Sequence, residues 1–188
     1  MTDPELVDDT QVRPRFSREQ RLERACLRVA MHIRGLYEER RSSDTRLLES
    51  LLLPDELVVV GRSLALSNGG PVRREHVVPR LFIIEACHAM IENGQSDAEV
   101  AAFIRDHIKV VLVTEGEAKK MDGRANLNLK QTMPEDWAFG DDLFKRLALA
   151  EIDWDPDWRP PLAKSKVRAG APASVQAYLA AWLSALKS

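Results

Sequence analysis

The feature that most constrains the fold is a run of apolar residues at helical spacing near the start of the chain. Ser17 followed by Gln20 matches the capping box that opens helices, because each side chain can satisfy a backbone N–H of the first turn. The pattern predicts a long amphipathic helix over residues 18–41 with an arginine-rich outer face. Its apolar positions are Leu22, Cys26, Val29, Ile33, Leu36 and Tyr37.

Further helices are predicted where capping and stop signals bracket apolar repeats. Ser96 with Glu99 and Thr114 with Glu117 are two more capping boxes, and a Pro or Gly ends a helical pattern. The final helix is amphipathic and follows a basic linker. The predicted segments are residues 44–53, 80–93, 96–107, 114–122, 141–150 and 173–186.

Strands are predicted at only a few places. Residues 57–60 are rich in valine, and a tight turn at Gly61-Arg62 followed by residues 63–66 predicts a short hairpin. Residues 110–113 form an apolar run that is typical of a buried strand. Residues 153–161 contain Trp and Pro and are expected to form a loop. The fold class predicted is therefore α+β, a mostly helical single domain with a small sheet.

Length and charge define the domain plan and the broad class. The chain has 188 residues and a formal net charge of -2, so it is long enough to bury a core and is not a bulk polycation. We expect a flexible tail over residues 1–16, a domain over 17–163, and a linker with a C-terminal helix over 164–188.

Cys26 and Cys87 lack CxxC spacing, which favours buried free thiols. No secretory signal or membrane-spanning run is present, which predicts a cytoplasmic protein without membrane contact.

The one stretch with a chemical signature is Arg73-Arg74-Glu75-His76-Val77-Val78-Pro79-Arg80. It is predicted as an extended segment that leads through a proline into a helix. An imidazole placed there can accept a proton from water, while a neighbouring carboxylate can hold a divalent cation. No P-loop, GxGxxG, GxSxG or HExxH pattern occurs, so nucleotide-dependent, hydrolase-triad and zincin chemistries have no support.

This stretch, with the predicted hairpin before it, resembles the first half of the HNH or ββα-metal nuclease motif. The resemblance covers residues 57–93, and the second half of the motif has no contiguous counterpart. It implies that His76 is the general base, that Glu75 orients it or binds metal, and that Mg²⁺ or Mn²⁺ is the cofactor. Candidates to complete the metal site are His88 and Asn93 in the following helix, or His107 and Asn126 further along the chain.

Two hypotheses follow for function. In the first, the protein is a metal-dependent endonuclease in which Arg74 and Arg80 steady the phosphate and Arg21, Arg24 and Arg28 follow the nucleic-acid backbone. In the second, it is a catalytically inert binding or inhibitor protein. Its partner is a nucleoprotein or protein complex, of the kind met by immunity or anti-defence proteins of mobile elements.

Each candidate feature also has a structural interpretation. Glu75 could pair with a nearby arginine and His76 with backbone, and His88 falls within an apolar helical pattern. The arginine-rich face could be a solvated surface balanced by glutamates. The acidic loop around Trp154 and Trp158 could bind a basic partner or be a loop anchored by its indole rings.

Overall fold

The computed structural model describes residues 16–161, and these residues form an α+β domain. The predicted tail before Phe16, the linker and the C-terminal helix lie outside the described residues. The elements in chain order are α1 (Arg18–Arg40), the 3-10 helix η2 (Thr45–Leu48), α2 (Asp55–Val58), β1 (Val59–Ser63), the 3-10 helix η3 (Leu64–Asn68), β2 (Val72–His76), α3 (Arg80–Glu92), α4 (Asp97–His107), β3 (Val110–Thr114), α5 (Glu115–Asp122), α6 (Lys145–Leu149) and β4 (Trp154–Asp155).

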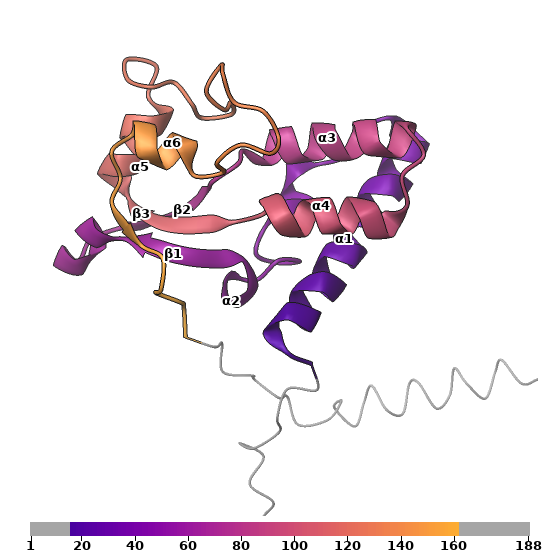
Figure 1. The fold of residues 1–188 in the computed structure, drawn as a ribbon, viewed down its shortest axis with the longest axis horizontal. Helices are drawn as coiled ribbons and strands as arrows, with labels where there is room; N and C mark the ends of the chain where they lie inside the picture. The colour runs from indigo at the N-terminus through magenta and orange to yellow at the C-terminus, as the bar shows by residue number, and fades with distance from the viewer. Residues whose placement is uncertain (1–15, 162–188) are drawn as a thin grey trace, which may run out of the picture.

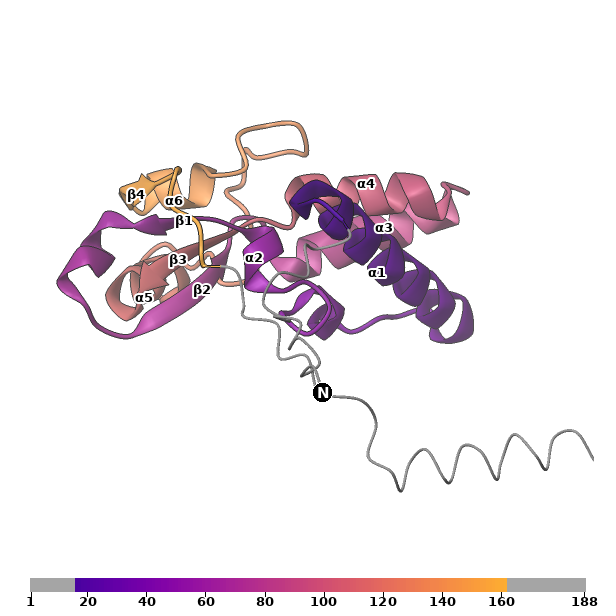
Figure 2. The same ribbon diagram turned by 90° about the horizontal axis from the view of Figure 1, so that it is seen from below.

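The helices form one half of the domain and the sheet forms the other. Helices α1, α3 and α4 pack on one another, while α5 and α6 lie with the sheet (Figure 1). The view turned by 90° separates the same two halves (Figure 2). Within residues 16–161, no helix is long and apolar enough to cross a membrane.

The long first helix is confirmed, and its start has the predicted cap. The Ser17 hydroxyl accepts a hydrogen bond from the Gln20 backbone N–H, and the Gln20 side chain accepts one from the Ser17 N–H. The helix ends at Arg41, which has a left-handed backbone conformation with φ of 58°. The capping boxes at Ser96 and Thr114 are also formed, so α4 and α5 begin where the sequence predicts.

The predicted hairpin between residues 57–60 and 63–66 is wrong, because β1 continues through the expected turn to Ser63 and the next residues form η3; β1 and β2 do not pair with each other either. The sheet order is β2-β3-β1-β4, so both strands use β3 as their partner. β1 runs parallel to β3, whereas β2 runs antiparallel to it with His76 opposite Val110. The chain leaves β1 through η3, whose first turn is capped by the buried Ser63: its hydroxyl accepts from Ala65 N–H and donates to Glu117. A cap at this position starts a helical turn, so the predicted second strand does not form.

Three other elements differ from the prediction. The helix predicted over residues 44–53 is only the 3-10 turn η2, because Glu49 is already extended. The helix predicted over 141–150 contracts to α6. Part of the loop predicted over 153–161 is the short strand β4, which pairs with β1. For β4, pairing with β1 decides the local conformation rather than propensity.

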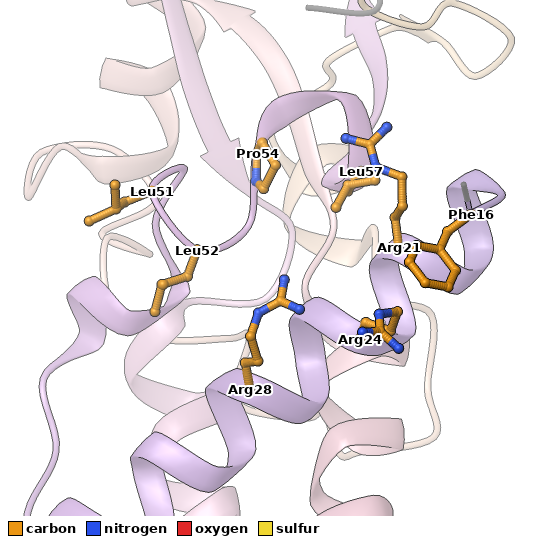
Figure 3. Close-up of a pocket in the computed structure, with 8 residues that line it drawn as sticks. All are labelled: Phe16, Arg21, Arg24, Arg28, Leu51, Leu52, Pro54 and Leu57. Atoms are coloured by element: carbon orange, nitrogen blue, oxygen red, sulfur yellow. The ribbon is translucent and has the colours of Figure 1, made fainter. Parts of the chain in front are cut away.

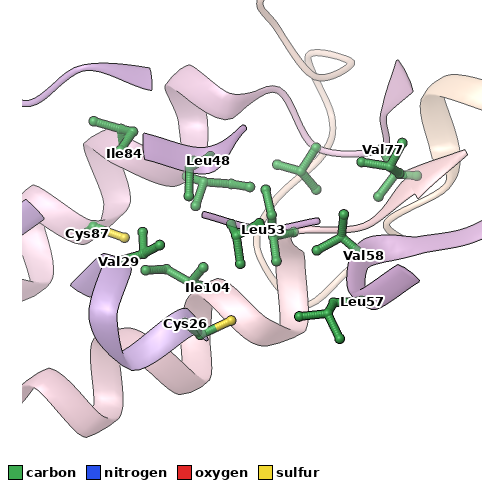
Figure 4. Close-up of a cluster of buried hydrophobic side chains, with 14 of the residues drawn as sticks. Cys26, Val29, Leu48, Leu53, Leu57, Val58, Val77, Ile84, Cys87 and Ile104 are labelled. Atoms are coloured by element: carbon green, nitrogen blue, oxygen red, sulfur yellow. The ribbon is translucent and has the colours of Figure 1, made fainter. Parts of the chain in front are cut away.

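The core runs from the three-helix half into the sheet half. Leu53 lies between side chains of the helical half, such as Cys26 and Ile84, and side chains beside the strands, namely Val58 at the end of α2 and Val77 just after β2 (Figure 4). Both cysteines are free and buried, as predicted, and burial raises the pKa of each thiol to about 12. The apolar residue Leu53 therefore joins the two halves into one core.

Candidate functional site

Glu75 and His76 lie at the end of β2, next to the crossing into α3. Successive side chains of a strand point to opposite faces of its sheet, so the two residues face different surroundings. The Glu75 carboxylate accepts a hydrogen bond of 2.9 Å from Arg146 of α6. Burial raises the pKa of Glu75, and the positive charge of Arg146 opposes that rise. Glu75 is thus engaged by a buried guanidinium.

Arg146 is the most deeply buried charged side chain described, with 1% of its surface exposed. Besides Glu75 it donates to the carbonyl oxygens of His76, at 2.7 Å, and Leu129. Asp122 adds a longer ion pair at 3.7 Å. One guanidinium therefore holds the end of β2, the chain after α5 and α6 together.

His76 points into a different, cationic environment. Its Nδ1 is shielded from solvent and has no hydrogen-bond partner within residues 16–161. Burial, and then the positive charges of Arg80, Arg74 and Arg146, lower the pKa of His76 to about 3. The imidazole is therefore neutral at neutral pH and is a weak base. Its role as the base of a nuclease stays a prediction.

The structure brings Arg74 and Arg80 together through a shared carboxylate. Arg80 is hydrogen-bonded to Glu49, and Arg74 lies 3.7 Å from the same side chain. Arg74 also forms an ion pair with Asp55, with 2.8 Å between Nε and Oδ1. The geometry of that contact is not a hydrogen bond, so the buried Arg74 Nε and Asp55 Oδ1 have no hydrogen-bond partner within residues 16–161. Two carboxylates thus oppose the two guanidinium groups that the sequence predicts to bind phosphate.

The predicted metal ligands belong to three separate groups of contacts. His88 is hydrogen-bonded to the Ser43 hydroxyl at 2.8 Å and its ring stacks on Tyr37, while the Asn126 amide donates to the Lys119 carbonyl. Glu75 is held by Arg146. Among residues 16–161, no group of three or more His, Cys, Asp or Glu side chains could hold a metal ion. Glu75, His88 and Asn126 therefore have different hydrogen-bond partners, and a shared Mg²⁺ or Mn²⁺ ion stays a prediction.

The environment of His76 predicts a pH dependence of folding stability. The pKa of His76 is about 3 in the folded protein and ordinarily 6.5, so below pH 6.5 the unfolded chain binds the extra proton. The contribution of His76 to the free energy of unfolding is therefore fully present above pH 6.5 and is lost as the pH falls toward about 3. Between about pH 7 and about pH 5 we expect this residue to lower the free energy of unfolding by up to about 2 kcal/mol.

Urea denaturation of the wild type and of His76→Gln at both pH values measures this effect. The variant should lose less stability than the wild type, since glutamine does not titrate. The lowered pKa of His88 acts in the same direction and the raised pKa of Glu75 acts in the opposite one, and both remain in the variant. Parallel pH profiles for the two proteins would contradict the burial of a neutral His76.

The indole rings of the acidic Trp loop are packed against the domain. Trp154 stacks on Phe144, with 4.8 Å between the ring centroids, and the Arg62 guanidinium lies over Trp158. Asp155 accepts hydrogen bonds from the backbone N–H groups of residues 157 and 158. These contacts match the structural interpretation of the loop.

A groove lies between α1 and the chain that leads from η2 to α2. Arg21, Arg24 and Arg28 are three and four positions apart, which places them on one face of α1. Figure 3 shows the Arg28 side chain extending from α1 toward Leu52 and Pro54. The groove has a volume of about 370 Å³, and its lining residues are Phe16, Arg21, Arg24, Arg28, Leu51, Leu52, Pro54 and Leu57.

The groove wall is set by two local features. The 3-10 helix η2 ends before the leucine run, which leaves Leu53 buried in the core and Leu51 91% exposed. Arg18 fixes the two sides of the groove to each other, because it donates to the backbone carbonyls of Glu56 and Leu57 at 2.8 and 2.7 Å. A largely exposed leucine is therefore held opposite a row of arginines.

The rim of the groove has an excess of positive charge. Arg21 forms an ion pair with Glu56 at 2.7 Å, and the Arg24 guanidinium lies 4.4 Å above the centre of the Phe16 ring. Arg28 is exposed and forms no ion pair with any side chain in the described part of the chain. One carboxylate thus faces three guanidinium groups.

The sequence identified the arginines of this groove but not its apolar wall. The available signal was Leu51-Leu52-Leu53 before Pro54, a run that one helix face cannot bury completely. Comparison with protein-family models, curated sequences and solved structures finds no match for the chain.

Proposed function

We propose that this protein is a binding protein whose arginine-rimmed groove receives an acidic protein segment that carries an aliphatic anchor. The observation that carries the proposal is the combination of three arginines with Leu51, whose side chain is 91% exposed. Guanidinium groups attract carboxylates and orient them, while burial of aliphatic side chains supplies affinity. This develops the second of the two hypotheses drawn from the sequence.

The lining favours a peptide over a nucleic acid. Single-stranded nucleic acids bind by stacking bases on aromatic rings, yet among the described residues that line the groove Phe16 alone is aromatic, and Arg24 lies over its ring. The remaining wall consists of leucines and a proline. From Arg21 to Arg28 the helix rises only about 10 Å, which is short for a row of phosphates. An acidic peptide with a Leu or Val side chain suits both the charge and the wall.

Binding can be measured by the fluorescence anisotropy of labelled peptides added to the full chain. The test peptide has a Leu-Val pair flanked by Asp and Glu, and two matched peptides replace the acids by Lys or the pair by Ser. We expect only the first to bind well, and Arg24→Glu with Arg28→Glu to weaken its binding about tenfold or more.

The matched control is Arg124→Glu, since Arg124 is exposed and lies outside the groove. This variant should bind the acidic peptide as the wild type does. Equal binding of the basic peptide, or no effect of the double charge reversal, would remove the proposal. Duplex DNA that binds in place of the peptide, and is lost in the double variant, would assign the groove to nucleic acid.

A further inference from the structure

The groove is continuous with a segment of the chain that has complementary chemistry. Phe16 is the first described residue and itself lines the groove, so residues 1–15 lead directly from its edge. Within them, residues 3–9 read Asp-Pro-Glu-Leu-Val-Asp-Asp. Four carboxylates thus flank a Leu6-Val7 pair. This pattern complements the arginine rim and the exposed Leu51 of the groove.

We propose that the N-terminal acidic segment, residues 3–9, occupies the arginine-rimmed groove of its own chain and competes there with an external partner. The inference rests on the proposed function, because it assigns an internal competitor to the same site. Asp8 and Asp9 pair with the arginine rim, and Leu6 covers the exposed Leu51. The partner must therefore displace a segment of like chemistry.

The length of the intervening chain permits this contact. Six residues lie between Asp9 and Phe16. An extended chain covers at most about 3.3–3.6 Å per residue, so this linker can span about 20 Å, which exceeds the rise of about 10 Å from Arg21 to Arg28 along α1. Because the linker is short, the effective concentration of the acidic segment at the groove is in the millimolar range. Even a weak contact is then largely occupied in the free protein.

Charge selects this occupant over the other end of the chain. Residues 162–188 carry Lys164, Lys166 and Arg168 before their apolar stretch, and the arginine rim repels these cations. A second copy of the chain could supply the same acidic segment between molecules. The experiment distinguishes a segment of the same molecule from one supplied by a second copy.

Cross-linking by cysteine measures the contact directly. Leu6→Cys is combined with Leu51→Cys in the full chain, and diamide oxidises the two thiols to a disulfide. Cys26 and Cys87 are buried, so the introduced pair reacts selectively. The matched control pair is Leu6→Cys with Leu64→Cys, since Leu64 is also exposed but lies in η3, outside the groove. We expect the Leu51 pair to close at least tenfold faster, within one molecule.

Adding Arg24→Glu and Arg28→Glu should slow the reaction to the rate of the control pair. Equal rates for the two cysteine pairs, or a disulfide formed mainly between two molecules, would overturn the proposal. A rate that charge reversal leaves unchanged would overturn it as well.

A second measurement separates this inference from the proposed function. In the full chain with Asp3→Asn, Glu5→Gln, Asp8→Asn and Asp9→Asn, the external acidic peptide should bind at least tenfold more tightly than to the wild type. If the peptide binds both proteins equally well, the groove is a binding site and only the internal competitor is wrong. If it binds neither, the proposed function fails with it.

Discussion

Replacing Arg146 by Met is expected to lower the free energy of unfolding by about 3–5 kcal/mol, which is typical of removing one partner from a buried ion pair. The Glu75 carboxylate, 13% exposed, would lose its cation, and the carbonyl oxygens of His76 and Leu129 would lose their donor. Methionine has a similar length and flexibility, so the effect reports charge and hydrogen bonds rather than a cavity. Urea denaturation at neutral pH measures the loss.

Two further variants separate this effect from a general one. Arg124→Met changes an exposed arginine and should stay within about 0.5 kcal/mol of the wild type. Arg146→Met combined with Glu75→Gln should recover part of the loss, because no uncompensated charge remains. A loss below about 1 kcal/mol for Arg146→Met would show that the guanidinium does not hold these segments together.

Gly61→Ala is the second change with a large expected effect, about 2–3 kcal/mol of destabilisation from overpacking. A Cβ atom at Gly61 would lie 2.3 Å from a ring carbon of Trp154 and 2.5 Å from the backbone oxygen of Asp155. Trp154 is itself stacked on Phe144, so the ring cannot move without disturbing β4 and its packing. Thermal and urea unfolding would both show the loss.

The same substitution elsewhere in the chain should act in the opposite direction. Gly35 lies inside α1, and a Cβ there meets no atom of the described chain within 4 Å. Gly35→Ala should therefore raise stability by about 0.5–1 kcal/mol, since alanine is the better helix former. If Gly61→Ala and Gly35→Ala changed the free energy of unfolding in the same direction and by the same amount, the close approach of Trp154 to β1 would be contradicted.

The sequence predicts well those elements whose conformation is determined by interactions between residues a few positions apart. The capping boxes at Ser17, Ser96 and Thr114 and the apolar spacing of α1 are local signals, and the structure confirms each helix start. Strand pairing is not local. Nothing near Val59 indicates that its partner is Val110, and Ser63 serves as a helix cap only because the chain turns there.

The same division applies to the candidate site. The spacing of Arg21, Arg24 and Arg28 puts them on one helix face, as predicted. Whether Leu51 or Leu53 faces the core depends on where η2 ends, which a leucine run does not specify. The partner of Glu75 is Arg146, far along the chain in a short helix, and no sequence pattern links the two.

The order of the sheet also has a consequence for folding during synthesis. The middle strands are β3 and β1, and both β1 and β2 are made before the β3 residues that pair with them. A ribosome delivers the chain from its N-terminus, so the two early strands wait unpaired while α3 and α4 emerge. Such distant pairing slows folding, and we expect the three-helix half to form first, with the sheet closing only after Thr114 has left the exit tunnel.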